Sequence, residues 1–155
     1  MSATDGIKKA WNKFRSLRGW QAWIVYILIG IGLGYGIRYG LGFILNTPDP
    51  VTTVISESMY PYYNIGDVLI VEGVPPKDIH VGDVVVYKLP GREIPIVHRV
   101  VAKGKYGVVT KGDNNPLPDP WCPIPWKDVE GKVVLRIPYI GYPKAELDRY
   151  LYGSS

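Results

Sequence analysis

The apolar positions of this chain begin with one long run. Residues 20–45 read WQAWIVYILIGIGLGYGIRYGLGFIL, twenty-six residues with a single charge at Arg38. As a helix this run extends about 39 Å, which exceeds the bilayer hydrocarbon core of about 30 Å. Arg38 lies toward the far end, where its side chain can snorkel to the interface. We predict a transmembrane helix over residues 20–45, and we interpret it as an uncleaved anchor because no small-residue cleavage pattern follows before Pro48.

Past residue 45 the apolar positions form short Val/Ile-rich runs separated by Gly, Pro, Asn and Asp. Runs of this kind are typical of β-strands joined by turns. They cover residues 51–55, 68–71, 84–87, 94–101, 108–110 and 133–137. A short helical turn is expected at 144–152. The pattern therefore predicts a mainly β domain, a small sheet or barrel formed by residues 46–155.

Two of these runs follow the same dipeptide. Gly66-Asp67 and Gly82-Asp83 each precede a strand-like run of Val, Ile and Leu. We interpret the pair as turn chemistry used twice, with Gly-Asp closing a turn before a buried strand. Neither aspartate is a candidate catalytic residue.

The net charge of +4 is concentrated before the apolar run. Residues 1–19 carry five basic side chains and Asp5, whereas the remaining chain balances thirteen basic against thirteen acidic residues. A nucleic-acid partner is therefore not expected, because the β domain has no basic stripe to present. By the positive-inside rule, residues 1–19 form a cytoplasmic tail and residues 46–155 lie outside the membrane.

The single cysteine, Cys122, cannot form a disulfide within the chain. It has no histidine near it in sequence, so we do not expect it to be a nucleophile. His80, His98 and Cys122 also lack the spacing of zinc ligands. We expect neither a metal nor a cofactor.

The candidate chemistry lies in a turn that follows the apolar run. Residues 56–61 read SESMYP, so that Ser58 is thirteen residues beyond Leu45 and within roughly 45 Å of the bilayer even in a fully extended chain. A serine hydroxyl needs a base to become a nucleophile, and His98 lies in a strand-like run that can hold it rigidly. Two aspartates, Asp113 and Asp119, follow in a Pro/Asn-rich loop. These residue types are the parts of a serine hydrolase.

In combination, these residues resemble type I signal peptidases of the archaeal and endoplasmic-reticulum branch, which use histidine where bacterial members use lysine. Four stretches carry the resemblance in the family's order: SESMYP at 56–61, NIGD at 64–67, IVHRV at 96–100 and KGDNN at 111–115, running on to Asp119. The chain departs from the family at Glu57, where glycine is common. It also has no second membrane span after Tyr142.

The resemblance implies a role for each candidate. Ser58 corresponds to the nucleophile and His98 to its base, while Asp113 and Asp119 correspond to the two required acidic positions. Ser56 corresponds to a hydroxyl that completes the oxyanion hole with the Ser58 amide. Either aspartate could orient His98. We favour Asp119, because Asp113 in Gly-Asp-Asn-Asn is suited to holding the turn itself.

The expected activity is that of a serine endopeptidase, signal peptidase I, which removes signal peptides from exported precursors at the outer membrane face. The resemblance implies cleavage after small residues at the first and third positions before the cut. We expect the precursor to add a strand beside residues 52–57. The positions expected to contact it are Thr52, Thr53, Val54, Ile55 and Glu57.

The expected surroundings are the cell membrane, crossed once with the N-terminus cytoplasmic, and the lipid bilayer itself. Accessory membrane subunits would be compatible with this arrangement. Two alternatives stay open. One is a membrane-tethered serine protease that processes another membrane substrate, and the other is an inert membrane-anchored β module.

Overall fold

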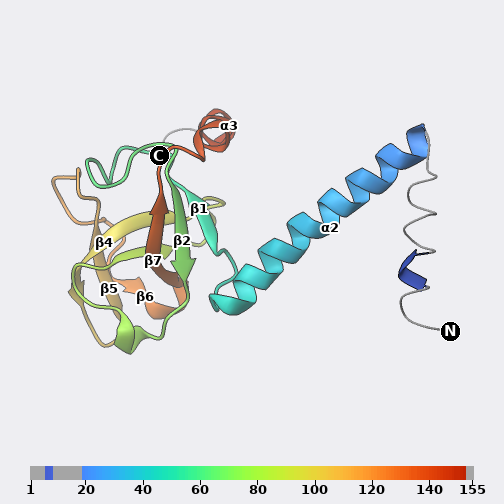
Figure 1. Ribbon diagram of the computed structural model, residues 1–155. Coiled ribbons are helices and arrows are strands. Elements are labelled where there is room, and N and C mark those ends of the chain that lie inside the picture. The colour runs from blue at the N-terminus through green and yellow to red at the C-terminus, as the bar shows by residue number, and fades with distance from the viewer. Residues whose placement is uncertain (1–5, 9–18, 153–155) are drawn as a thin grey trace. The chain divides into compact units, whose positions relative to one another are not determined.

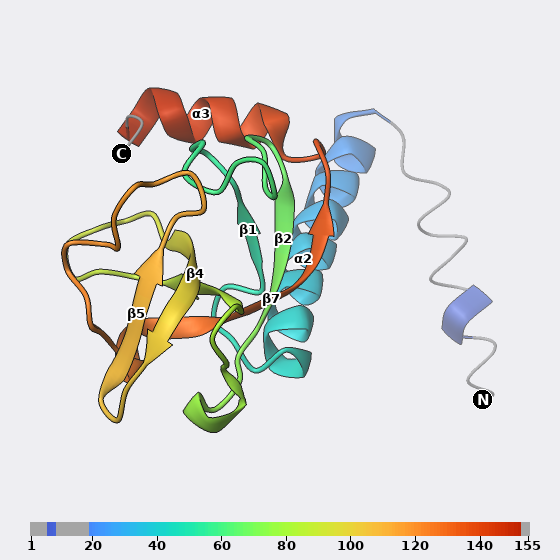
Figure 2. The same cartoon turned by 90° about the vertical axis from the view of Figure 1, so that its left-hand side faces the viewer.

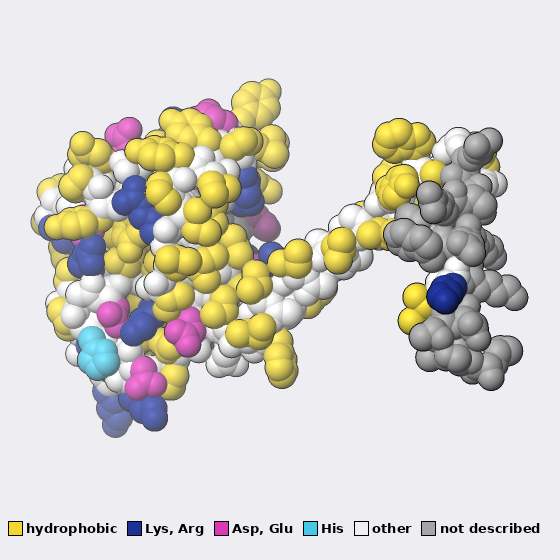
Figure 3. All heavy atoms as spheres, viewed as in Figure 1, with side chains coloured by type: hydrophobic (Ala, Val, Ile, Leu, Met, Phe, Trp, Pro, Cys, Tyr) yellow, Lys and Arg dark blue, Asp and Glu magenta, His cyan; other side chains and the backbone are white. Residues whose placement is uncertain are grey.

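The computed structural model describes residues 6–8 and 19–152, and the chain divides into two units, residues 1–40 and 41–155. Helix α2 (Trp20–Ile44) has 25 residues, and its apolar side chains are exposed (Figure 3). Among the described residues it is the one helix whose length and composition would allow it to cross a membrane. The helix predicted over residues 20–45 is present from Trp20 to Ile44, and its membrane crossing stays a prediction. Most of the predicted basic tail, residues 1–19, lies outside the described residues.

The second unit is built on one curled sheet of seven antiparallel strands (Figures 1 and 2). The strand order is β1-β2-β7-β3-β4-β5-β6. The strands are β1 (Val51–Thr53), β2 (Val68–Glu72), β3 (Val84–Tyr87), β4 (Ile96–Lys103), β5 (Gly107–Lys111), β6 (Ile124–Pro125) and β7 (Val129–Ile137). Two short 3-10 helices, Pro76–Asp78 and Trp126–Asp128, and helix α3 (Tyr142–Tyr152) complete the unit. The predicted mainly β fold with one N-terminal apolar helix is confirmed.

Several predicted strand boundaries were wrong. The run at 51–55 forms a strand only to Thr53, although Val54 still exchanges backbone hydrogen bonds with Gly66 and Asp67. The run at 133–137 begins earlier, at Val129, because β7 pairs with β3 before it pairs with β2. The two-residue strand β6 was not predicted. A run that changes partners midway does not show the simple alternation on which sequence-based assignment depends.

Two other boundaries moved by a few residues. The run expected at 94–101 forms β4 from Ile96 to Lys103, and the short helix expected at 144–152 begins at Tyr142. Both shifts are of the size usual for element ends, which are set by local hydrogen bonds more than by apolar pattern.

The repeated Gly-Asp turns are present as predicted. Gly66 and Gly82 have φ angles of 87° and 100°, which favour glycine. In both turns the aspartate carboxylate accepts a hydrogen bond from a backbone N–H three residues earlier, Asn64 in the first and His80 in the second. These bonds measure 2.7 and 2.9 Å.

The main hydrophobic core lies around strands β3, β4 and β5. Its fully buried members are Ile79, Val85, Tyr87, Val100, Val108 and Ile124. His98 lies in β4 directly opposite Val85 of β3 and is 6% exposed. Strand β3 therefore holds the backbone of this histidine on one side, and the pairing of β4 with β5 begins at the next residue, Arg99.

Candidate active site

The candidate nucleophile Ser58 lies in the loop between β1 and β2. Two hydrogen bonds from Asn114 hold this loop: the Asn114 backbone N–H donates to the Ser58 carbonyl at 2.8 Å, and its side-chain amide donates to the Glu57 carbonyl at 3.2 Å. The neighbouring Met59 side chain is 1% exposed and anchors the loop in the domain. The serine is therefore placed by a loop that packing and backbone hydrogen bonds restrain.

His98 connects Ser58 to Asp119. Its Nε2 lies 3.1 Å from Ser58 Oγ, and its Nδ1 lies 2.7 Å from Asp119 Oδ2. An ionised carboxylate can only accept, so the Nδ1–H donates to Asp119 and the Nε2 lone pair faces the serine hydroxyl. This tautomer is the one that a general base for Ser58 requires.

Asp119 is the last of these three hydrogen-bonded residues, and its side chain is buried, with 3% of it exposed. It comes from the loop between β5 and β6, and its backbone N–H donates to the Thr110 carbonyl at 2.9 Å. Burial by itself raises the pKa of this carboxyl, but hydrogen bonds from His98, Thr110 and Tyr87 and the electrostatic attraction of His98 outweigh it, so the pKa of Asp119 is lowered. The group stays ionised near neutral pH.

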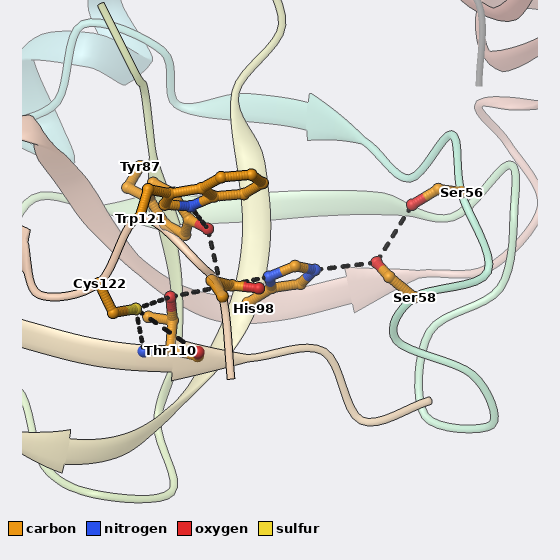
Figure 4. A network of polar contacts seen from close by, with 8 residues as sticks. Ser56, Ser58, Tyr87, His98, Thr110, Trp121 and Cys122 are labelled. Atoms are coloured by element: carbon orange, nitrogen blue, oxygen red, sulfur yellow. Dashed lines mark hydrogen bonds and ion pairs between the residues drawn. The ribbon is translucent and has the colours of Figure 1, made fainter. Parts of the chain in front are cut away.

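Ser56 adjoins the nucleophile on its other side. Its Oγ lies 3.1 Å from Ser58 Oγ (Figure 4). If the Ser58 hydroxyl donates to His98, then the Ser56 hydroxyl must be the donor in this contact. Figure 4 shows the serines and His98 in one line of polar contacts. Ser56, Ser58, His98 and Asp119, all candidates from the sequence, are therefore brought together.

Asp113 has a different partner. Its two carboxylate oxygens accept from Arg99 Nε at 2.8 Å and from an Arg99 terminal nitrogen at 2.6 Å. This bidentate pair ties the loop after β5 to the strand that carries His98. His98 is hydrogen-bonded to Asp119, and the contacts of Asp113 link its loop to β4 more than they close the turn.

A groove of about 870 Å³ opens over Ser58 and His98. Three of the predicted substrate-contacting residues, Thr53, Val54 and Ile55, line it, whereas Thr52 and Glu57 are not among its lining residues. Other walls come from the segments 91–97 and 115–121 and from Tyr152 in α3. A groove of this volume can hold a peptide segment, and Ser58 and His98 are among the residues that line it.

Three residues of the site were missed in the sequence. The Tyr87 hydroxyl and Thr110 Oγ1 both donate to Asp119 Oδ2, at 2.9 and 2.6 Å, and the Trp121 indole N–H donates to the Tyr87 oxygen at 3.0 Å. The sequence offered a weak signal for Tyr87 and Thr110 alone, a hydroxyl at the end of a Val-rich run, as in VVVY and GVVT. Such a hydroxyl requires a partner once its strand is buried.

Cys122 joins this network at Thr110, whose Oγ1 lies 3.6 Å from its Sγ (Figure 4). Its Sγ accepts a hydrogen bond from the Thr110 backbone N–H at 3.2 Å. In the described part of the chain, no three His, Cys, Asp or Glu side chains are grouped so that they could hold a metal ion.

Comparison with known proteins assigns the site to a family. The family described as signal peptidase, peptidase S26, matches residues 20–114. The chain belongs to this family. A relative from Schizophyllum commune, named signal peptidase complex catalytic subunit, is 37% identical over 138 residues and covers 72% of each chain. A protein of the same name from Colletotrichum graminicola is 38% identical over 122 residues, covering 72% of this chain and 71% of its own.

Membership in the signal peptidase family makes the chain an enzyme, a serine-type peptidase, as the sequence predicted. The predicted resemblance to type I signal peptidases of the archaeal and endoplasmic-reticulum branch is confirmed. The matched range includes α2, Ser58, His98 and Asp113, and it ends before Asp119.

Proposed function

We propose that this chain removes signal peptides from exported precursors, with Ser58, His98 and Asp119 as its catalytic triad. The observation that carries the proposal is the line of hydrogen bonds from Ser58 Oγ through His98 to Asp119, at 3.1 and 2.7 Å, on the floor of a peptide-sized groove. Membership in the signal peptidase family supports the substrate class.

In the proposed mechanism, Ser58 Oγ attacks the scissile carbonyl while His98 Nε2 takes its proton. His98 then returns the proton to the leaving amine, and a water molecule activated by the same nitrogen hydrolyses the acyl-enzyme. Asp119 holds the imidazole in the required tautomer and stabilises the imidazolium that forms.

The oxyanion of the tetrahedral intermediate would be bound by the Ser58 amide and the Ser56 hydroxyl. Ser56 Oγ lies 3.1 Å from the nucleophile, beside the place where the oxyanion would form. A donor aimed at the developing negative charge typically contributes about 10² to 10³ in rate. Asp113 would support the site through Arg99 without contacting the substrate.

The precursor would bind as an extended strand along the groove. β1 is the terminal strand of the sheet, so its outer edge is suited to strand addition, and Thr53, Val54 and Ile55 continue from it into the groove. Backbone hydrogen bonds would supply affinity. Shallow apolar walls beside Ser58 would select small side chains at the first and third positions before the cut.

The proposed arrangement in the membrane follows from the charge pattern. Residues 1–19 form a cytoplasmic tail, residues 20–45 cross the bilayer, and residues 46–155 place the catalytic domain outside. The precursor's scissile bond would then be presented just beyond its own apolar segment. The relatives are named catalytic subunits of a complex, which supports accessory membrane subunits for this chain as well.

The test is cleavage of an exported precursor by the detergent-solubilised full chain, with the cut site read by mass spectrometry. We expect cleavage after a small residue, and no detectable cleavage by Ser58→Ala or His98→Ala. Their double variant should be scarcely worse, since the two groups act as a unit. His80→Ala is the matched control, because His80 is the other histidine and its side chain is 72% exposed.

The outcomes separate the alternatives. Wild-type activity confined to another membrane protein would indicate a different tethered protease. Activity that survives Ser58→Ala would exclude the proposed nucleophile. A chain that cleaves nothing, with unchanged behaviour in both variants, would indicate an inert β module.

A further inference from the structure

The Asp119 carboxylate receives more donors than the triad needs. Its Oδ2 accepts from His98 Nδ1 at 2.7 Å, from Thr110 Oγ1 at 2.6 Å and from the Tyr87 hydroxyl at 2.9 Å. Thr110 and Tyr87 are fully buried. Since solvent cannot replace these two hydroxyls, they determine where this oxygen lies and how it faces the imidazole.

The direction of the Tyr87 hydrogen bonds is fixed. Burial raises the pKa of the Tyr87 phenol, so its hydroxyl stays protonated and donates to Asp119. The phenol oxygen then accepts from the Trp121 indole N–H, which is a donor only. Donation therefore runs one way, from Trp121 to Tyr87 to Asp119.

Tyr87 also contacts the base. Its ring meets the His98 ring edge to face, with centroids 6.4 Å apart and an interplanar angle of 62°. One buried side chain of β3 thus touches both the imidazole and its carboxylate partner. The β3–β4 register places it there, because Tyr87 and His98 lie on adjoining strands of the same sheet.

Trp121 brings this donor chain to the groove. It lines the groove with 37% of its surface exposed, and the Arg92 guanidinium lies 5.3 Å from its ring centroid. A peptide in the groove would therefore lie against the residue whose indole N–H holds the Tyr87 oxygen.

We propose that Tyr87 is a positioning residue for the Asp119–His98 pair and that Trp121 fixes Tyr87 from the groove wall. The inference rests on the proposed function, because it takes Asp119 and His98 as parts of the triad. Tyr87 touches neither Ser58 nor the expected scissile bond, so its effect on cleavage would pass through Asp119.

The pH dependence of cleavage distinguishes this role from simple packing. The groups facing Asp119 are His98 from β4, Tyr87 from β3 and Thr110 from β5, with Cys122 behind Thr110. Each donor stabilises the carboxylate and so lowers the proton affinity of the coupled Asp119–His98 pair. Removing one donor should make the pair bind its proton at higher pH.

The experiment compares Tyr87→Phe with wild type in the full solubilised chain, using an exported precursor. The substitution keeps the core ring and removes the hydroxyl. We expect kcat/KM to fall about tenfold and the acid limb of its pH profile to move up by about half a unit to one unit. Trp121→Phe is a change at the surface that spares the fold. It should move the acid limb upward by less than Tyr87→Phe does, and it should raise KM.

The matched control is Tyr63→Phe, which removes a half-buried phenol hydroxyl outside the network and should leave the profile unchanged. A Tyr87→Phe enzyme with lowered melting temperature and an unmoved acid limb would overturn the positioning role. An unmoved acid limb in Trp121→Phe would overturn the role proposed for Trp121.

The Ser58→Ala variant separates the inference from the proposed function. If Ser58→Ala retained activity, the proposed function would fail, and this inference with it. An inactive Ser58→Ala beside an unmoved Tyr87→Phe profile would refute the inference alone.

Discussion

Asp113 and Asp119 belong to the same loop, yet their carboxylates have different partners. Asp119 is bonded to His98, Thr110 and Tyr87, and Asp113 is bonded to Arg99 through both oxygens. The first set of contacts acts on the imidazole that would carry the proton. The second set connects the loop after β5 to strand β4, and its loss would displace that loop.

At this scale we predict that the two aspartates separate activity from stability. Asp119→Asn replaces the charged oxygen that accepts from three donors with a neutral amide, and we expect kcat/KM to fall by as much as about 10⁴ with a stability loss of about 1–2 kcal/mol. Asp113→Asn breaks a partly buried charged pair, and we expect a loss of about 1–3 kcal/mol with only about tenfold lower activity.

Melting curves and cleavage rates on the same preparations check this prediction. Asp119→Asn should affect folding as well as activity, because three donors converge on the Asp119 carboxylate. A stable but inactive Asp113→Asn beside an Asp119→Asn that cleaves normally would reverse the two roles.

The residues of the candidate site differ in how far the sequence could predict them. Ser58 and His98 stand in short motifs whose order is typical of one family, so they were identifiable before any fold was known. Tyr87, Thr110 and Trp121 were not, because each looks like an ordinary strand or loop residue. Their role depends on which strands adjoin, and that is decided by long-range pairing rather than by local pattern.

Among the elements, the shortest strand closes the loop that carries two residues of the site. β6 pairs with β5 through Val108↔Ile124 and Gly107↔Pro125, and this pairing closes the loop that carries Asp119 and Trp121. A Cβ at Gly107 would overlap the Ile124 carbonyl. Gly107 is therefore required by close approach of two backbones rather than by an unusual φ angle.

We predict that Gly107→Ala pushes β6 away from β5 and lowers the free energy of unfolding by about 1–3 kcal/mol. Cleavage should fall as well, because the displaced strand moves the loop that holds Asp119. Gly104→Ala is the control in the same hairpin, since a Cβ there would make only an ordinary 3.6 Å contact with the Gly107 carbonyl. Equal melting temperatures for the two variants would show that β6 does not depend on this close approach.

The sequence predicted six of the seven strands. The strand that it did not predict, β6, was missed for a physical reason. β6 has two residues, one of them proline, between Cys122 and the 3-10 helix Trp126–Asp128. A strand this short has no periodicity of its own. It exists because Gly107 lets the two backbones approach, which only the folded sheet reveals.

The whole molecule combines two units that are stable in different surroundings. Residues 1–40 contain most of an apolar helix whose side chains are exposed, and residues 41–155 form a β domain with its own buried core. An exposed apolar helix of 25 residues is stable in a bilayer and not in water. The β domain has balanced charge, so the orientation of the chain would depend on residues 1–19.

We predict that the tail is cytoplasmic and the β domain external, because the five cations before Trp20 resist translocation. Protease added to intact cells should degrade the β domain and spare an epitope on the tail, and permeabilised cells should lose both. Changing Lys8, Lys9, Lys13, Arg15 and Arg18 to glutamate should weaken or invert this orientation, whereas glutamate at five exposed basic positions of the β domain should not. A protected β domain with a digested tail would contradict the orientation, and with it the access of the groove to exported precursors.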